Sequence, residues 1–431
     1  MTNYKYTESD LEKAVLEWIE DLGYSIAFGP DIAPDGESRE RESYKDVLLI
    51  ARLREAVARL NPSIPKEAQD DAIKKIIAVA YSSPEFIIAN QLFHRLIVSG
   101  VDVEYRRKDG TIAGDKVYII DAKNPNNNDW LAVNQFTVIE NNHNRRPDVV
   151  IFVNGLPLAV FELKNPADVN ATIEGAFNQI QTYKSEIPSL FAYNEFCIIS
   201  DHIKNATVGT ISANLERFVG WKSLDGDNFY KTNDLDILIK GIFAKERLLD
   251  LVKNFIVFEN EKDSRNNITK TIKKLAAYHQ YFAVNKAVKS TLEAASPSGD
   301  KRAGVIWHTQ GSGKSLTMVF YAGKIVQELD NPTLVLLTDR NDLDGQLHGT
   351  FSKCNELIRQ TPKQAQDRDD LKKLLSVASG GVIFTTIQKF MPSEKGSKHP
   401  LLSDRRNIVV MADEAHRSQY DFIDGFARHM H

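Results

Sequence analysis

The sequence of 431 residues contains only two cysteines, Cys197 and Cys354, and they form no CxxC motif. This scarcity excludes a disulfide scaffold and a cysteine-ligated zinc finger, and it fits a reducing cytosol. No apolar run approaches the roughly 18 residues that cross a bilayer, and the N-terminus is not a signal peptide. We therefore expect a cytoplasmic protein.

A strong charge of either sign is also missing. Lys and Arg total 54 against 58 Asp and Glu, which gives a formal net charge of -4. This balance excludes a protein that holds DNA by bulk positive charge, so any nucleic-acid contact must come from a local basic surface or from a partner. The hydrophobic fraction of 42% is that of a globular protein, and the length predicts two or three domains at roughly 150 residues each.

The order of periodic segments predicts two kinds of domain, and we find no internal repeat. Helical periodicity at 7–23, 44–60 and 67–80 is followed after Gly100 by short β-rich runs, which predicts a mixed α/β domain. Further on, apolar strands alternate with helices, which predicts a parallel doubly wound sheet. The expected strands of this second part are 305–308, 333–337, 382–385 and 408–411. We place the boundary near residue 255, which gives domains 1–255 and 256–431.

The strongest single motif is Gly311-Ser312-Gly313-Lys314-Ser315, between an expected strand at 304–308 and an apolar helical run. Backbone N–H groups of such a loop surround phosphate oxygens at a helix N-terminus. Lys314 is expected to reach the β- and γ-phosphates of ATP, and Ser315 to ligate Mg²⁺. His308 stands where the strict pattern has glycine, a variant similar to that of superfamily-2 helicases. A glycine-rich turn with a chance lysine is the disfavoured alternative.

Further along the chain, Asp413-Glu414-Ala415-His416 follows an apolar strand. Ligands of parallel α/β sheets bind at the carboxyl ends of the strands, so Asp413 is expected to hold Mg²⁺ and Glu414 to polarise the attacking water. A solvated acidic strand end is the alternative. Thr338–Asp344 and Thr385–Gln388 resemble helicase motifs that contact the nucleic-acid backbone. Residues 278–281 resemble the adenine-recognising glutamine motif, with Gln280 reading the base, although a core-packing helix explains them equally well.

A second constellation lies in the N-terminal half, where Pro147-Asp148 and Glu162-Leu163-Lys164 sit on two apolar strands joined around Asn154-Gly155. Glu162 and Lys164 share one face of their strand. Regular pairing around a two-residue turn would place Asp148 opposite Phe161, on the wrong face, so we predict an odd loop or a bulge. Asp148 and Glu162 would then ligate Mg²⁺, while Lys164 steadies the nucleophile or the phosphate.

These residues match the PD-(D/E)xK nuclease pattern, which is short, and an ordinary surface hairpin is its alternative. The strands are apolar on both faces, which disfavours that alternative. Gln179 and Tyr183 share a helix face and resemble the QxxxY accessory motif of RecB-like nucleases. Glu8 and Glu12 on the N-terminal helix each offer a further carboxylate, and the sequence does not choose between them. Phosphate contacts could come from Arg145, Arg146 and Lys184, although solvated charge explains each singly.

A PD-(D/E)xK hairpin followed by a DEAH-type motor resembles the restriction (R, HsdR) subunit of type I restriction–modification enzymes. The order of the two domains supports this resemblance, since type III restriction subunits carry the nuclease after the motor. The resemblance implies a restriction-endonuclease-like domain, a first RecA-like motor domain, Mg²⁺ and ATP as cofactors, and cleavage of double-stranded DNA after ATP-driven translocation. It also implies methyltransferase and specificity subunits as partners.

Two other interpretations remain open. One is a DNA-repair helicase–nuclease without a methyltransferase partner, and the other is a truncated remnant that only binds DNA. The sequence ends at His431, soon after the DEAH residues, before the second motor domain that the family carries. We therefore expect the chain alone to bind nucleotide weakly at most and not to translocate.

Overall fold

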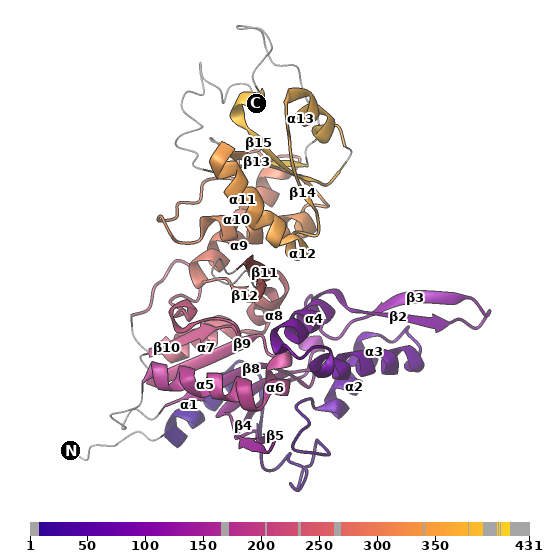
Figure 1. The fold of residues 1–431 in the computed structure, drawn as a ribbon, viewed down its shortest axis with the longest axis vertical. Helices are drawn as coiled ribbons and strands as arrows, with labels where there is room; N and C mark the ends of the chain where they lie inside the picture. The colour runs from indigo at the N-terminus through magenta and orange to yellow at the C-terminus, as the bar shows by residue number, and fades with distance from the viewer. Residues whose placement is uncertain are drawn as a thin grey trace. The chain divides into compact units, whose positions relative to one another are not determined.

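The computed structural model describes residues 8–164, 172–202, 205–231, 234–262, 269–338, 341–377, 379–390, 403, 405 and 407–413. The chain divides into two compact units, Met1–Tyr278 and His279–His431, which we describe separately (Figure 1). The expected boundary near residue 255 thus falls inside the first unit. Among the helices described, none is long and apolar enough to cross a membrane.

The first unit is a mixed α/β structure, as expected. Its helices are α1 (Glu8–Asp21), α2 (Ile50–Leu60), α3 (Lys66–Ala78), α4 (Phe86–Ser99), α5 (Ile173–Glu186), α6 (Pro188–Ala192), α7 (Asp234–Ile242) and α8 (Lys245–Asn254). Its strands are β1 (Ser25–Phe28), β2 (Val101–Arg106), β3 (Ile112–Val117), β4 (Trp130–Asn134), β5 (Val138–Glu140), β6 (His143–Arg145), β7 (Val149–Val153), β8 (Leu156–Leu163), β9 (Phe196–His202), β10 (Asn205–Gly209), β11 (Ile256–Lys262) and β12 (Thr269–Leu275).

A six-stranded mixed sheet of order β1-β4-β7-β8-β9-β10 forms the centre of this unit. The β1–β4 and β8–β9 pairs are parallel, and the other neighbours are antiparallel. Every residue of β7 and β8 is buried, because α5 packs against β8 and β9 while α1 packs against β4 and β8. The apolar strands therefore lie in the core.

The β7–β8 hairpin contains the predicted bulge. Val153 pairs with Leu156 across a two-residue turn, and the register shifts between Ile151 and Phe152, so Leu158 is skipped and Val149 pairs with Phe161. Asn154 and Gly155 both have positive φ, 53° and 77°, as a tight hairpin turn requires. The skipped residue places Asp148 opposite Glu162, which confirms the expectation drawn from strand parity.

Two segments differ from the expected elements because their backbones bond to distant parts of the chain. Residues 44–49 were expected to be helical, but α2 begins only at Ile50: the carbonyl of Tyr44 accepts from Ile139, and the N–H of Leu49 donates to Gly155. The sequence also predicts helix-like segments around residues 238–260, but residues 256–262 form β11 and pair with β12. This hairpin belongs to the first unit because Lys273 of β12 is buried there, 2.6 Å from Glu195.

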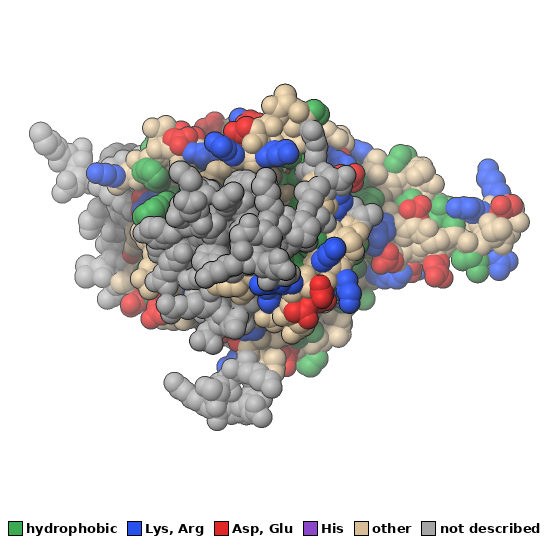
Figure 2. Space-filling view, turned by 90° about the horizontal axis from the view of Figure 1, so that it is seen from above, with side chains coloured by type: hydrophobic (Ala, Val, Ile, Leu, Met, Phe, Trp, Pro, Cys, Tyr) green, Lys and Arg blue, Asp and Glu red, His purple; other side chains and the backbone are tan. Residues whose placement is uncertain are grey.

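A second hairpin, β2–β3, lies over α3 and extends away from the sheet (Figure 1). Its inner residues Val101, Val103, Ala113 and Val117 are buried. In the space-filling view, Lys, Arg, Asp and Glu side chains are mixed with hydrophobic ones along it (Figure 2). This arm therefore carries mixed charge and no block of one sign.

The second unit contains a parallel sheet of order β14-β15-β13-β16. Its elements are α9 (Tyr278–Ala295, whose first residue ends the first unit), α10 (Lys314–Glu328), β13 (Thr333–Thr338), α11 (Asn341–Lys353), α12 (Asn355–Ile358), β14 (Pro362–Gln364), α13 (Arg368–Leu375), β15 (Val382–Thr386) and β16 (Ile408–Ala412). The strands expected at 333–337, 382–385 and 408–411 are confirmed.

The strand expected at 304–308 was wrong for this structure. These residues form no ladder with the described strands, and Val305 and Trp307 are 84% and 89% exposed. An apolar run is a local signal, whereas a strand also needs a neighbouring edge that accepts and donates its backbone hydrogen bonds.

Candidate nuclease and nucleotide sites

Asp148, Glu162 and Lys164 come together at one end of the β7–β8 hairpin. The carboxylates of Asp148 and Glu162 are buried, with 6% and 2% of each residue exposed. Asp148 Oδ2 accepts a hydrogen bond of 2.6 Å from the N–H of Leu163, and the Lys164 ammonium forms an ion pair with Glu162. The bulge thus assembles two acids and one lysine on neighbouring strands.

Tyr183 and Gln179 lie beside these carboxylates. α5 starts with Thr172 as its N-cap, whose hydroxyl accepts from the N–H of Gly175, and this helix directs Tyr183 into the core. Burial, and then the negative charges of Glu162 and Asp148, raise the pKa of Tyr183 well above its ordinary value. The phenol therefore stays protonated at neutral pH, and its hydroxyl can donate a hydrogen bond to a carboxylate beside it.

The N-terminal helix α1 is connected to the same region through Gln135, a residue that no sequence motif singled out. Both oxygens of Glu12, which is buried, accept from the side-chain amide of Gln135 at 2.9 Å. The backbone N–H of Gln135 in turn donates to the carbonyl of Asp148 at 3.0 Å. The side chain of Glu8 lies outside the described residues. Sequence reasoning missed Gln135 because its role depends on contacts with partners far away along the chain.

The three cations considered as phosphate contacts have different surroundings. Arg145 forms an ion pair with Glu186. Lys184 is buried and donates to the carbonyl of Ile211 at 2.8 Å, so its charge does not face solvent. Arg146 is exposed. Lys184 is therefore not a solvated surface charge, which was the alternative explanation for these three residues.

The paired carboxylates suit a hard cation. Magnesium prefers oxygen ligands and keeps several waters while binding one or two carboxylates, which Asp148 and Glu162 can supply. Within the described part of the chain, no group of three or more His, Cys, Asp or Glu side chains could hold a metal ion. The residues present therefore fit an ion shared between two protein carboxylates and water.

In the second unit, the glycine-rich loop precedes α10 as the sequence predicts. Gly311 and Gly313 have φ of 81° and 83°, and Lys314 is the first residue of the helix. Gln280 of α9 is buried, and its amide donates to the Gly313 carbonyl at 3.1 Å and to the Thr317 hydroxyl at 3.2 Å. Gln280 therefore packs against the loop.

His308 and His279 lie next to each other beside this loop, with ring centroids 5.5 Å apart. Burial, together with the charges of His279 and Lys314, lowers the pKa of His308. His279 Nε2 lies 3.2 Å from the Ser312 carbonyl. An imidazole therefore occupies the space beside the loop where the strict motif has glycine.

Three strands end at one edge of the parallel sheet. Thr338 of β13 is in register with Thr386 of β15, and the N–H of Asp413, directly after β16, donates to the Leu337 carbonyl at 3.0 Å. Asp413 thus stands at the carboxyl edge, as expected. Glu414, Ala415 and His416 lie outside the described residues, as do Asp339 and Arg340.

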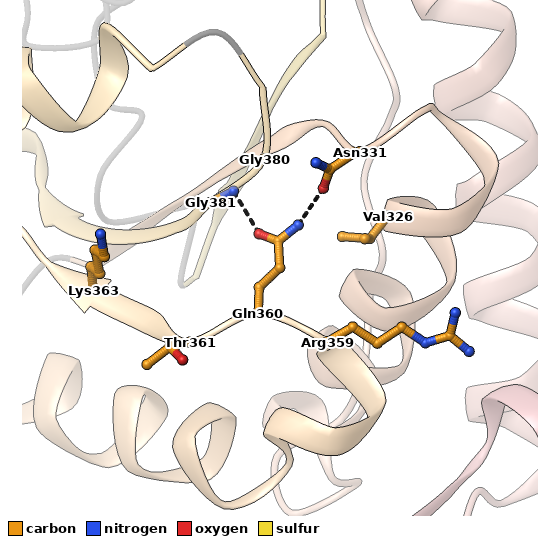
Figure 3. A pocket seen from close by; sticks show the side chains of 8 residues that line it. All are labelled: Val326, Asn331, Arg359, Gln360, Thr361, Lys363, Gly380 and Gly381. Carbon is orange, nitrogen blue, oxygen red and sulfur yellow. Dashed lines mark hydrogen bonds between the residues drawn. The ribbon is translucent and has the colours of Figure 1, made fainter. Parts of the chain in front are cut away.

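A pocket lies at the opposite edge of this sheet, where β13 and β15 begin (Figure 3). Gln360 spans it, donating to Asn331 Oδ1 and accepting from the N–H of Gly381, both at 2.6 Å. Because nucleotides bind at the carboxyl ends of parallel strands, this pocket is not the nucleotide site.

Comparison with known proteins identifies both units. Residues 5–217 match the family model described as the type I restriction enzyme R protein N terminus, and residues 279–431 match that of the SWI2/SNF2 ATPase. The chain is 46% identical, over 98% of its length, to the type I restriction enzyme HindI endonuclease subunit of Haemophilus influenzae. It belongs to the R-subunit family of type I restriction enzymes.

The chain is also similar to a second protein of this kind. A putative type I restriction enzyme endonuclease subunit of Methanocaldococcus jannaschii, MjaIXP, is 36% identical over 95% of this chain. The chain covers 41% and 40% of these two relatives. The hairpin β11–β12 lies between the two regions that match family models.

Proposed function

We propose that this chain carries the Mg²⁺-dependent endonuclease of a type I restriction enzyme, joined to the first nucleotide-binding part of its ATP-driven DNA motor. The substrate is double-stranded DNA, and the partners are methyltransferase and specificity subunits. The observation that supports the nuclease most directly is the bulge in β8, which places Asp148 opposite Glu162 beside Lys164.

The nuclease residues have separate tasks in this proposal. Asp148 and Glu162 hold the ion, which when bound activates water and neutralises charge on the phosphate. The Lys164 ammonium, already next to Glu162, donates to a phosphate oxygen or holds the attacking water. Tyr183 donates its hydroxyl to Glu162 and keeps that carboxylate in one orientation. Burial of both acids strengthens these interactions by excluding bulk water.

The motor residues are assigned in the same way. N–H groups of residues 311–315 surround the ATP phosphates, Lys314 contacts the β- and γ-phosphates, and Ser315 and Asp413 hold a second Mg²⁺. Glu414 polarises the attacking water. The contact of Gln280 with the Gly313 carbonyl supports a role in shaping the loop, in addition to reading adenine.

Cleavage of supercoiled plasmid by the purified chain in Mg²⁺ tests the nuclease assignment. We expect nicked and linear products from the wild type, none after chelation, and at least about 100-fold less from Lys164→Ala, since phosphate-stabilising groups contribute that much. Equal nicking by the variant and the wild type would discard the assigned site. Binding of a fluorescent ATP analogue, compared with Lys314→Ala, tests the motor assignment separately.

A further inference from the structure

The turn after β4 is strained and held from several sides. Gln135 has a φ of 57°, a left-handed conformation that is strained for a residue other than glycine. A Cβ on Gly29 would lie 2.3 Å from the Gln135 carbonyl oxygen, so the end of β1 approaches this turn as closely as only glycine allows. Such strain persists where surrounding contacts fix it, and it concentrates at functional sites.

Phe136, the next residue in the chain, is also held in place by contacts of its ring. The guanidinium carbon of Arg41 lies 3.9 Å from the centre of the Phe136 ring, and Arg41 is 3% exposed. Phe136 also packs edge to face on Phe152 of β7. The chain therefore has little freedom to move on either side of Gln135.

From this position Gln135 makes two contacts toward the carboxylates. Its backbone N–H donates to the carbonyl of Asp148 at 3.0 Å, and its side-chain amide donates to both oxygens of Glu12 at 2.9 Å. One strained residue thus connects Asp148, which directly precedes β7, with a buried acid of α1.

We infer that Gln135 is a positioning residue of the nuclease site: its backbone fixes Asp148, and its amide holds the Glu12 carboxylate close by as an outer carboxylate of the metal site. This inference rests on the proposed nuclease function. It assigns the accessory acid to Glu12 and gives it an indirect role, because its oxygens are engaged by the amide. Partners that orient a metal ligand in this way typically contribute 10–100-fold to metal affinity.

Titration calorimetry with Mn²⁺ on the full chain tests the inference, with the melting temperature measured in parallel. Gln135→Asn introduces a residue that tolerates positive φ, but its side chain is shorter by one carbon. Gln135→Glu keeps the length and removes the donor. We expect both variants to bind Mn²⁺ about 10-fold or more weakly, with the melting temperature of Gln135→Asn close to that of the wild type. Wild-type affinity in both would overturn the inference.

Gln69→Asn is the matched control, because the amide of Gln69 likewise donates two hydrogen bonds, here to the backbone carbonyls of Asn61 and Ile64. It should leave Mn²⁺ affinity unchanged, and an equal loss there would show a general effect of the substitution and overturn the inference. If Gln135→Asn folds poorly, Gln135→Gly suits the same φ and also lacks the amide. Asp148→Asn separates the two proposals: if it binds Mn²⁺ as the wild type does, the nuclease site itself is wrong.

Discussion

The ammonium of Lys273 lies 2.6 Å from the carboxylate of Glu195, and both side chains are completely buried. Lys273 also donates to Asn90 Oδ1 and to the Asn194 carbonyl, each at 2.9 Å. The backbone N–H of Glu195 donates to the carbonyl of Leu158, the residue skipped in the bulge, at 2.7 Å. Lys273 of the β11–β12 hairpin therefore lies in the core beside the six-stranded sheet.

Removal of the Lys273 charge should destabilise the first unit severely. Loss of one partner leaves a buried charge uncompensated, so we expect Lys273→Met to lower the free energy of unfolding by about 3–5 kcal/mol. Lys274→Met is the comparison, because Lys274 is only partly buried and pairs with Glu259 and Glu261 within the hairpin, so its loss should cost less than that of Lys273. Urea unfolding measures both, and equal effects would contradict this expectation.

The domain boundary can be tested with shortened proteins. A protein of residues 1–278 keeps the Lys273–Glu195 pair, whereas one of residues 1–255 loses β11 and β12. We expect a cooperative thermal transition only for the longer protein, since the shorter one leaves Glu195 in the core without its lysine. Circular dichroism melting distinguishes them, and matching transitions would place the boundary nearer residue 255.

Tyr183→Phe should affect cleavage beyond its effect on stability. Loss of a buried hydroxyl hydrogen bond costs about 1 kcal/mol, and loss of the donor to Glu162 should slow cleavage about 10-fold. Tyr193→Phe serves as the comparison, because its buried hydroxyl lies 3.1 Å and 2.9 Å from the carbonyls of Ile76 and Ile77. That variant should lose similar stability and keep the cleavage rate of the wild type.

Gly313→Ala should weaken nucleotide binding. A Cβ there would lie 2.8 Å from Gln280 Nε2, at a φ of 83°. The left-handed backbone alone costs about 1–2 kcal/mol. A loop that relaxes out of this conformation must regain it to bind phosphate, so we expect the Kd of a fluorescent ATP analogue to rise about 10-fold. Gly349→Ala, where a Cβ meets nothing within 4 Å, should bind normally. An unchanged Kd in Gly313→Ala would argue against this loop as the phosphate site.

Cys197 should make stability fall at alkaline pH. Burial raises the pKa of its thiol from 9.0 to about 11. Between these values the unfolded chain releases the proton while the folded chain retains it, so the folded state loses stability as the pH rises through this window. The difference in unfolding free energy between wild type and Cys197→Ala, measured at pH 8 and at pH 11, should show this loss. A difference independent of pH would contradict it.

Local features of the sequence predicted much of this molecule. Residues 311–315 formed the expected loop because glycine sterics and helix periodicity act over a few residues. The Asn154-Gly155 turn followed from the same short-range rules. Strand parity, combined with the requirement that Asp148 face Glu162, even predicted the bulge in β8.

Contacts between distant segments were beyond the reach of the sequence. Glu12 and Gln135 are separated by 123 positions, and no spacing rule joins them or Lys273 to Glu195. Residues 304–308 read as a strand, yet pairing depends on a neighbouring edge that periodicity does not describe. The sequence by itself determined the motifs, turns and most elements, because these depend on local sterics and periodicity. The tertiary structure alone decided the strained Gln135 turn, the buried ion pair and the extent of the first unit, because these arise only when remote segments meet in the core.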